Sequence, residues 1–154
     1  AYLDRPSAAE QVKIINSKVG KNDTLIILGD VGNVEWVKQL RGYKVLVCGN
    51  HDAGVSNYLG EKLFQEVYSG PVMIGEKLIL SHEPIENCDW CFNIHGHDHS
   101  RLHKNDKYHF NVNADVIGYI PINFNRWMKQ GHLAQVKSLH RKAIDKQIAN
   151  KRKE

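Results

Sequence analysis

The apolar residues of this chain gather in short runs, and each of the main runs ends in a cluster of polar residues. Residues 24–28 read Thr-Leu-Ile-Ile-Leu and are followed by Gly-Asp. Similar runs at residues 44–48 and 77–80 end in Gly-Asn-His-Asp and Ser-His-Glu-Pro, and a run at residues 91–94 ends in His-Gly-His-Asp-His. Continuous apolar runs of this length are typical of strands buried on both faces. The pattern therefore predicts four strands with polar groups at their carboxyl ends.

Helical periodicity fills several intervals between these runs. Ser7 is a candidate N-cap, Glu10 completes a capping box, and the apolar spacing that follows predicts a helix ending at Gly20. A helix predicted over residues 33–40, between the first two strands, gives the order of a βαβ unit. Further helices are expected at residues 57–66, at residues 124–130 behind Asn123, and along a stripe from residue 133 to 148. Further strands are expected at residues 72–74, in a hairpin with residues 77–80, and at residues 108–112, in an antiparallel pair after a turn.

The length of 154 residues fits a single domain with its own core. The net charge of +4 is unevenly spread, because the residues from Lys129 onward carry +6 and the rest carry −2. We therefore expect one domain over residues 1–154 with a basic helical tail at about residues 132–154. Such a tail can bind nucleic acid, although a basic stretch is more often a solvated helix face.

Location is also constrained by the sequence. No apolar run approaches the ~20 residues of a membrane span, so we expect no membrane association. The chain opens without a signal-peptide pattern, and its three cysteines, an odd number, do not indicate a disulfide framework. We therefore expect a cytoplasmic protein.

The polar clusters have the composition of a metal site. The carboxyl ends of strands are the ligand-binding edge of open α/β sheets. Asp30, Asn50, His82, His97 and His99 would offer oxygen and nitrogen ligands without thiolate, a set that suits Mn, Fe, Zn or Ni ions. An aspartate can bridge two cations, and a neutral Asn ligand suits an anionic substrate. These features indicate metal-assisted hydrolysis of a phosphate ester.

Four segments in order resemble the motifs of the calcineurin-like metallophosphoesterases. Residues 28–30, 48–52, 80–84 and 95–99 match the GD, GNH(D/E), H and GHxH blocks of that family. Residues 111–116 resemble the strand that follows GHxH in small bacterial and phage members. The resemblance covers about residues 4–124 and leaves the basic tail outside.

The resemblance implies an α+β or α/β fold: a sandwich of two β-sheets flanked by helices (αββα) around two divalent metal ions, Mn before Fe, Zn or Ni. Asp30 would bridge both ions, Asn50, His82 and His97 would complete one site, and His99 would belong to the other. His51 would bind the phosphate or protonate the leaving oxygen, and Asp52 would orient or tune it. Asn33 would contact the substrate or simply start a helix, and His95 would have a supporting role.

One departure from the family is large. The Asp-x-His motif that ends the family's first strand does not occur here, so we expect that this chain lacks that first strand. The leading hypothesis is a metal-dependent phosphoesterase acting on phosphomonoesters or phosphodiesters. The alternatives are a non-catalytic binding module with the same fold, favoured by the absent motif, and a nuclease that uses the basic tail.

Overall fold

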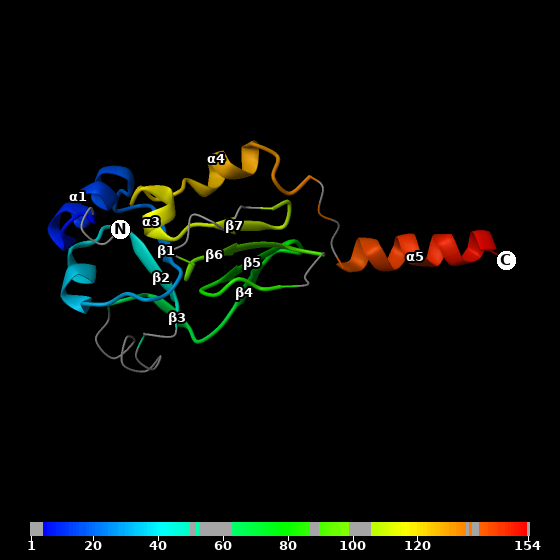
Figure 1. The fold of residues 1–154 in the computed structure, drawn as a ribbon, viewed down its shortest axis with the longest axis horizontal. Coiled ribbons are helices and arrows are strands. Elements are labelled where there is room, and N and C mark those ends of the chain that lie inside the picture. Colours follow the sequence, from blue (N-terminus) through cyan, green and yellow to red (C-terminus); the bar gives the residue numbers. More distant parts are fainter. Residues whose placement is uncertain are drawn as a thin grey trace.

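The computed structural model describes residues 5–49, 52, 63–86, 90–98, 106–134, 136 and 139–153. Within these residues the chain forms two small sheets, short helices beside them, and one longer helix that extends away (Figure 1). The carboxyl ends of strands from both sheets meet at one place, and the candidate site lies there.

The first sheet has three parallel strands in the order β1-β2-β3. β1 spans Thr24–Ile27 and β2 spans Tyr43–Val47, which confirms the two strands predicted from the apolar runs. β2 is buried over most of its length, but β1 is not buried on both faces as predicted, because Ile26 is 39% exposed. β3, Glu66–Tyr68, was not predicted. A helix was predicted over residues 57–66, but its described end, residues 63–66, is not helical, because Leu63 and Phe64 are buried in the core and the chain then enters β3.

The second sheet has four strands in the order β4-β5-β6-β7. β4, Val72–Ile74, and β5, Leu78–Ser81, form the predicted antiparallel hairpin. β6, Phe92–His95, lies parallel to β5, and β7, His109–Asn111, lies parallel to β6. The antiparallel partner that we expected for β7 before residue 104 lies outside the described residues.

Asparagine and serine side chains cap the helices. α1, Ala8–Lys18, begins as predicted, because the Ser7 side chain accepts a hydrogen bond from the Glu10 N–H at 3.2 Å. α4, Phe124–Lys129, also begins as predicted behind Asn123, which caps Arg126 N–H. Segment η2, Val34–Gln39, forms a 3₁₀-helix instead of the expected α-helix. The remaining helices are α3, Ala114–Ile117, and α5, Leu139–Lys153. The strand that the resemblance implied over residues 111–116 is wrong beyond Asn111, because Asn113 caps α3 and the chain turns into that helix.

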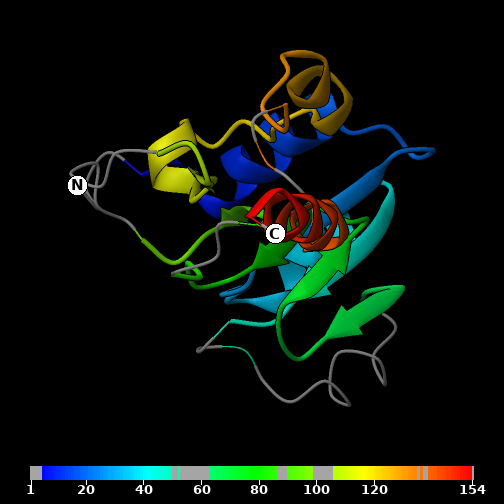
Figure 2. The ribbon, with the colours of Figure 1, turned by 90° about the vertical axis from the view of Figure 1, so that its right-hand side faces the viewer.

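The αββα sandwich that we expected is wrong. The described residues form two small sheets of three and four strands and few helices, instead of two sheets each covered by a helical layer. α1, α3 and α4 lie on one side of the strands, and α5 extends away from them (Figures 1 and 2). The helix predicted along the stripe from residue 133 to 148 begins only at Leu139, because residues 131–134 form turns, and most of the described side chains of α5 are exposed. The prediction that this chain lacks a first strand was part of the sandwich prediction, so it is withdrawn as well.

Each sheet has its own core. Val37 of η2 packs with Leu46, Leu63 and Phe64 beside the first sheet. Trp127 of α4 packs on the second sheet, where its ring lies 5.2 Å from the Phe92 ring. Each of these two apolar clusters thus holds the strands of its own sheet in place. No helix in the described part of the chain combines the length and apolar character that crossing a bilayer requires.

His109 ties β7 to the segment after β5. Its Nδ1 donates to the Asp106 carboxylate at 2.9 Å, and its Nε2 donates to the Ile85 carbonyl at 2.6 Å. Because both partners are acceptors, the two bonds form together only when both ring nitrogens carry a proton, so this geometry favours the imidazolium. Burial alone would lower the pKa of His109, but the bonds to the Ile85 carbonyl and to Asp106 outweigh it and raise that pKa above its usual value. The pKa of Asp106 is lowered, because bonds from Tyr108 N–H and His109 outweigh its partial burial.

His109→Gln tests this connection through the pH dependence of stability. A raised folded-state pKa contributes stability that is fully present below the unfolded pKa of ~6.5 and is lost as pH rises through the folded value. The variant should therefore unfold more easily than the parent, by about 1 kcal/mol near pH 5.5 and by much less near pH 8.5. Denaturant unfolding at the two pH values measures this difference. An equal difference at both would show that His109 is not held as a cation.

Candidate metal site

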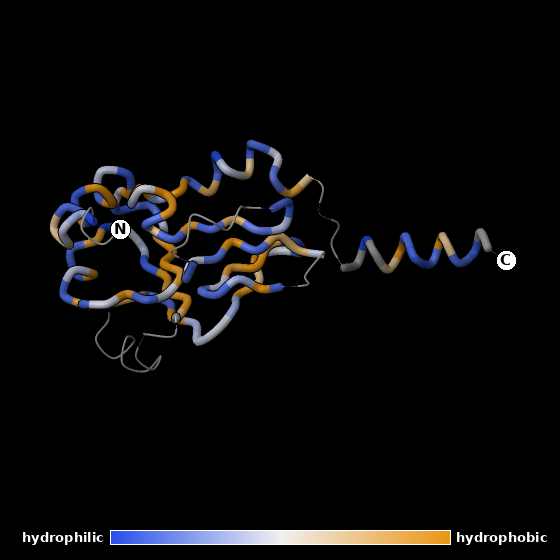
Figure 3. Tube along the Cα trace, viewed as in Figure 1, coloured by the Kyte–Doolittle hydropathy of each residue, from blue (hydrophilic) through white to orange (hydrophobic). Residues whose placement is uncertain are grey.

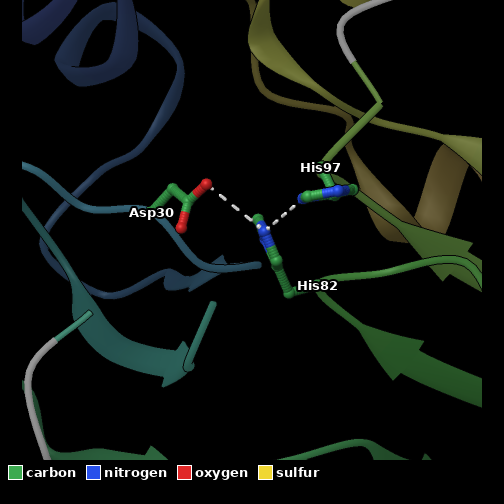
Figure 4. Close-up of side chains that lie close together, drawn as sticks. All are labelled: Asp30, His82 and His97. Atoms are coloured by element: carbon green, nitrogen blue, oxygen red, sulfur yellow. Dashed lines mark hydrogen bonds and ion pairs between the residues drawn. The ribbon is translucent and has the colours of Figure 1, made fainter. Parts of the chain in front are cut away.

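Segments that follow four strands converge at one place between the two sheets. Asp30 follows β1, Asp52 follows β2, His82 follows β5 and His97 follows β6. Figure 4 shows Asp30 approaching His82 from one side and His97 approaching it from the other. The sequence predicted that these strand ends would meet, and the structure brings three of the predicted ligands, Asp30, His82 and His97, together.

The three side chains have the spacing of metal ligands. His82 Nε2 lies 3.3 Å from Asp30 Oδ2 and 3.0 Å from His97 Nδ1. One ligand atom from each residue lies within 4.8 Å of the others. Ligand atoms bonded to one ion at ~2.0–2.2 Å are about 3.0–3.5 Å apart when they are neighbours. The three residues thus hold two nitrogens and one oxygen at distances that one divalent ion can bridge.

A backbone carbonyl fixes the orientation of His82. Its Nδ1 lies 2.7 Å from the carbonyl oxygen of Leu28, which can only accept a hydrogen bond. Nδ1 therefore carries the proton in the neutral ring, and Nε2 presents its lone pair to Asp30 and His97. His82 is 6% exposed, so its ring cannot turn freely. Protein metal sites commonly hold a ligating histidine by such a bond from its other nitrogen.

Two of the candidate ligands have unusual backbone conformations. Asp30 has φ 52° and His97 has φ 62°, both in the left-handed region that non-glycine residues seldom adopt. Such conformations cost on the order of 1–3 kcal/mol each and are concentrated at functional sites. At both positions the chain reverses directly after a strand, and this turn points the side chain toward His82.

Gly29 and Gly49 allow the two loops of the first sheet to approach each other. A Cβ added at Gly29, which has φ 89°, would clash with His82 Nδ1 and lie 2.7 Å from Gly49 Cα. A Cβ added at Gly49 would lie 2.6 Å from Asp30 Oδ1 and 2.9 Å from His82 Cγ. Glycine at both positions is therefore required by close packing around His82.

Asp52 holds the backbone of the site. Its carboxylate accepts hydrogen bonds from the N–H groups of Asp30 at 2.8 Å, Val31 at 2.8 Å and Gly49 at 2.6 Å. These bonds join the loop after β1 to the loop after β2 and fix the turn that carries Asp30. Sequence reasoning missed this role, and the only signal for it was the position of an aspartate three residues after a strand-ending glycine.

Several predicted site residues are outside this geometry. Asn50, His51 and His99 lie outside the described residues, so the roles expected for them, and the tuning of His51 by Asp52, stay predictions. Asn33 caps η2 by accepting from Glu35 N–H at 3.0 Å, which is the helix-start role. His95 is 5% exposed and its Nδ1 donates to the Gly96 carbonyl, and burial lowers the pKa of its ring. A buried supporting position agrees with the role expected for His95.

The site opens on a groove large enough for a substrate. The groove has a volume of about 1980 Å³ and is lined by the three candidate ligands. Apolar side chains line it as well, among them Leu25, Leu80 and Phe110. The three candidate ligands therefore lie at one part of a broad concavity that exceeds the ~300–1,000 Å³ of typical ligand pockets.

Comparison with known proteins gives a likeness of fold. The chain is similar to a solved structure described as the protein of unknown function AQ665 from Aquifex aeolicus, with a TM-score of 0.62 and 25% sequence identity. The match covers 82% of this chain and 87% of that chain. No protein-family model and no curated protein matches the sequence. The likeness therefore supports the overall chain path and carries no activity with it.

Gly29→Ala should disturb the site far more than Gly32→Ala. Both glycines have positive φ, 89° and 72°, so both substitutions cost about 1–2 kcal/mol of backbone strain. A Cβ at Gly32 meets no atom within 4 Å, whereas a Cβ at Gly29 clashes with His82. We expect Gly29→Ala to cost at least about 2 kcal/mol more in denaturant unfolding. Equal losses for the two variants would mean that the contact between Gly29 and His82 is not tight.

Proposed function

We propose that this chain is a metal-dependent phosphoesterase that hydrolyses phosphomonoesters or phosphodiesters. The observation that carries the proposal is the convergence of Asp30, His82 and His97 from three strand ends, with the lone pair of His82 Nε2 oriented by the Leu28 carbonyl. The resemblance of the surrounding motifs to the calcineurin-like metallophosphoesterases supports the same chemistry.

The donor set fits a divalent transition-metal ion. Two imidazole nitrogens and one carboxylate oxygen suit Mn, Fe, Zn or Ni ions, and Mn is the first candidate. Only one of the three ligands is charged, so a bound divalent ion would keep a net positive charge. Asp52 is committed to three backbone N–H groups and is not counted among the three ligands. Such a site attracts an anionic ester.

A divalent ion at this position supplies Lewis-acid activation of water and stabilises charge on phosphoryl oxygens. Asp30, His82 and His97 would hold the ion, and Asp52 keeps the Asp30 turn in the conformation that directs its carboxylate to His82. The buried face of His82 excludes bulk water from one side of the site. In the reaction a water molecule gives up a proton to the solvent and its oxygen bonds to phosphorus, while the ester P–O bond breaks. The leaving oxygen takes a proton, for which His51 is the proposed donor, and His51 then regains a proton from the solvent.

Further parts of the hypothesis rest on the sequence. A second ion, with His99 among its ligands, and Asn50 as a ligand of the first ion are proposed from the resemblance to the family. Asn33 stays a proposed substrate contact, and the cytoplasmic location stays a prediction.

Two variants separate metal binding from folding. Asp30→Asn keeps the shape of the side chain and removes its charge. His82→Asn keeps an N–H donor near the position of Nδ1, facing the Leu28 carbonyl, and removes the Nε2 ligand atom. After metal removal and titration with MnCl₂, we expect both variants to bind the ion weakly and to lose about 10²–10⁴-fold in kcat/KM on p-nitrophenyl phosphate and its bis-ester.

Asp23→Asn is the matched control, because Asp23 is exposed and only caps Gly20 N–H at 2.8 Å. It should keep both metal binding and turnover. Tight metal binding by the parent without hydrolysis of either ester would contradict the phosphoesterase proposal and favour the binding module. Unchanged metal affinity in Asp30→Asn and His82→Asn would contradict the ligand assignment itself.

A further inference from the structure

α5 extends away from both sheets, and most of the side chains that the structure describes in it are exposed. Figure 1 shows the helix projecting from the body, and its 15 residues correspond to a rod of about 22 Å. Most of its described side chains are exposed, among them Arg141, Lys146 and Lys151. A helix that buries so little apolar surface adds little to the stability of the core.

The charge of α5 is strongly positive. Its sequence holds six basic residues and a single acidic one, Asp145, for a net charge of +5. Asp145 is paired with Arg141 at 3.4 Å, and the Arg141 side chain remains 62% exposed. Figure 3 shows a predominantly hydrophilic helix beside a body whose strands carry the apolar residues. The helix therefore has a positive electrostatic potential, which attracts a polyanion.

Five of the six basic positions fall on two rows, and Lys151 lies on neither. At 100° per residue, positions 142, 146 and 153 share one face of the helix, and positions 141 and 152 share another about 110° away. Ala149 and Asp145 lie between the two rows, and Asp145 is paired with Arg141 of one row. A helix with side chains is about 10–12 Å across, and the major groove of B-DNA is about 12 Å wide with a phosphate backbone on each side. Two basic rows on one helix match the two backbones that flank such a groove.

We propose that α5 binds duplex DNA by lying in the major groove and contacting the phosphates on both sides. The contacts are independent of sequence, because Lys and Arg bind phosphates by their charge, and phosphate contacts carry no sequence information. A-form RNA is excluded as the preferred duplex, since its major groove is too narrow for a helix.

A membrane surface is a weaker match for this helix. An amphipathic helix that binds lipid has a continuous apolar face opposite its charges. In the described part of α5 the large apolar side chains are Ile144 and Ile148, one turn apart, and exposed polar residues continue on both sides of them. The inference concerns a binding surface remote from the strand ends and does not rest on the proposed catalytic activity.

The test measures the anisotropy of a labelled DNA duplex of about 20 base pairs between about 50 and 200 mM salt. The full chain should bind with a slope of log K against log salt of about −4, as expected for four to five phosphate contacts. Arg141→Gln/Lys146→Gln removes one charge from each row and keeps good helix formers. Its slope should shrink by about 2, and its affinity near 100 mM salt should fall about tenfold or more.

Lys13→Gln/Lys21→Gln is the matched control, because it removes the same charge from exposed positions on the body. It should bind DNA like the parent, and circular dichroism should show the same helix content in all three proteins. Three results would overturn the proposal: equal binding by both double variants, tighter binding of duplex RNA than of DNA, or binding to phosphatidylserine vesicles in preference to DNA.

Discussion

The hydrogen bond from His82 Nδ1 to the Leu28 carbonyl connects the two halves of this structure. Leu28 directly follows β1 of the first sheet, and His82 directly follows β5 of the second. The bond fixes the imidazole in one tautomer and one orientation, and the His82 carbonyl in turn accepts from Gly96 N–H at 2.9 Å. Through these two bonds the ends of β1, β5 and β6 are held together, and every other feature of the candidate site is arranged around the ring of His82.

The cost of this arrangement appears in the backbone next to it. Asp30 and His97 hold conformations that favour glycine, and Gly29 and Gly49 leave no room for a side chain. The three N–H groups bound by Asp52 offset part of the strain, because they fix the Asp30 turn from the opposite side. A site assembled under strain before any ligand arrives is a preorganised site, and it has less ordering entropy to lose on binding.

Local signals in the sequence predicted much of the chain and the position of the site. The cap at Ser7 and the apolar runs that became β1 and β2 act over a few residues, so periodicity was sufficient to find them. The sandwich prediction was wrong because the stacking of layers depends on contacts between distant segments, and a resemblance confined to loop motifs does not determine them. The role of Asp52 was missed for a similar reason: its partners at Asp30 and Val31 lie more than twenty residues away in sequence.

The central claim is that Asp30, His82 and His97 bind one divalent ion, with His82 Nε2 as one of its ligand atoms. Crystals soaked in MnCl₂ and measured at the manganese absorption edge test it directly. The account predicts an anomalous peak about 2.0–2.3 Å from both His82 Nε2 and an Asp30 carboxylate oxygen, with His82 Nδ1 still bonded to the Leu28 carbonyl. A crystal with manganese bound elsewhere and no peak beside His82 Nε2 would contradict it.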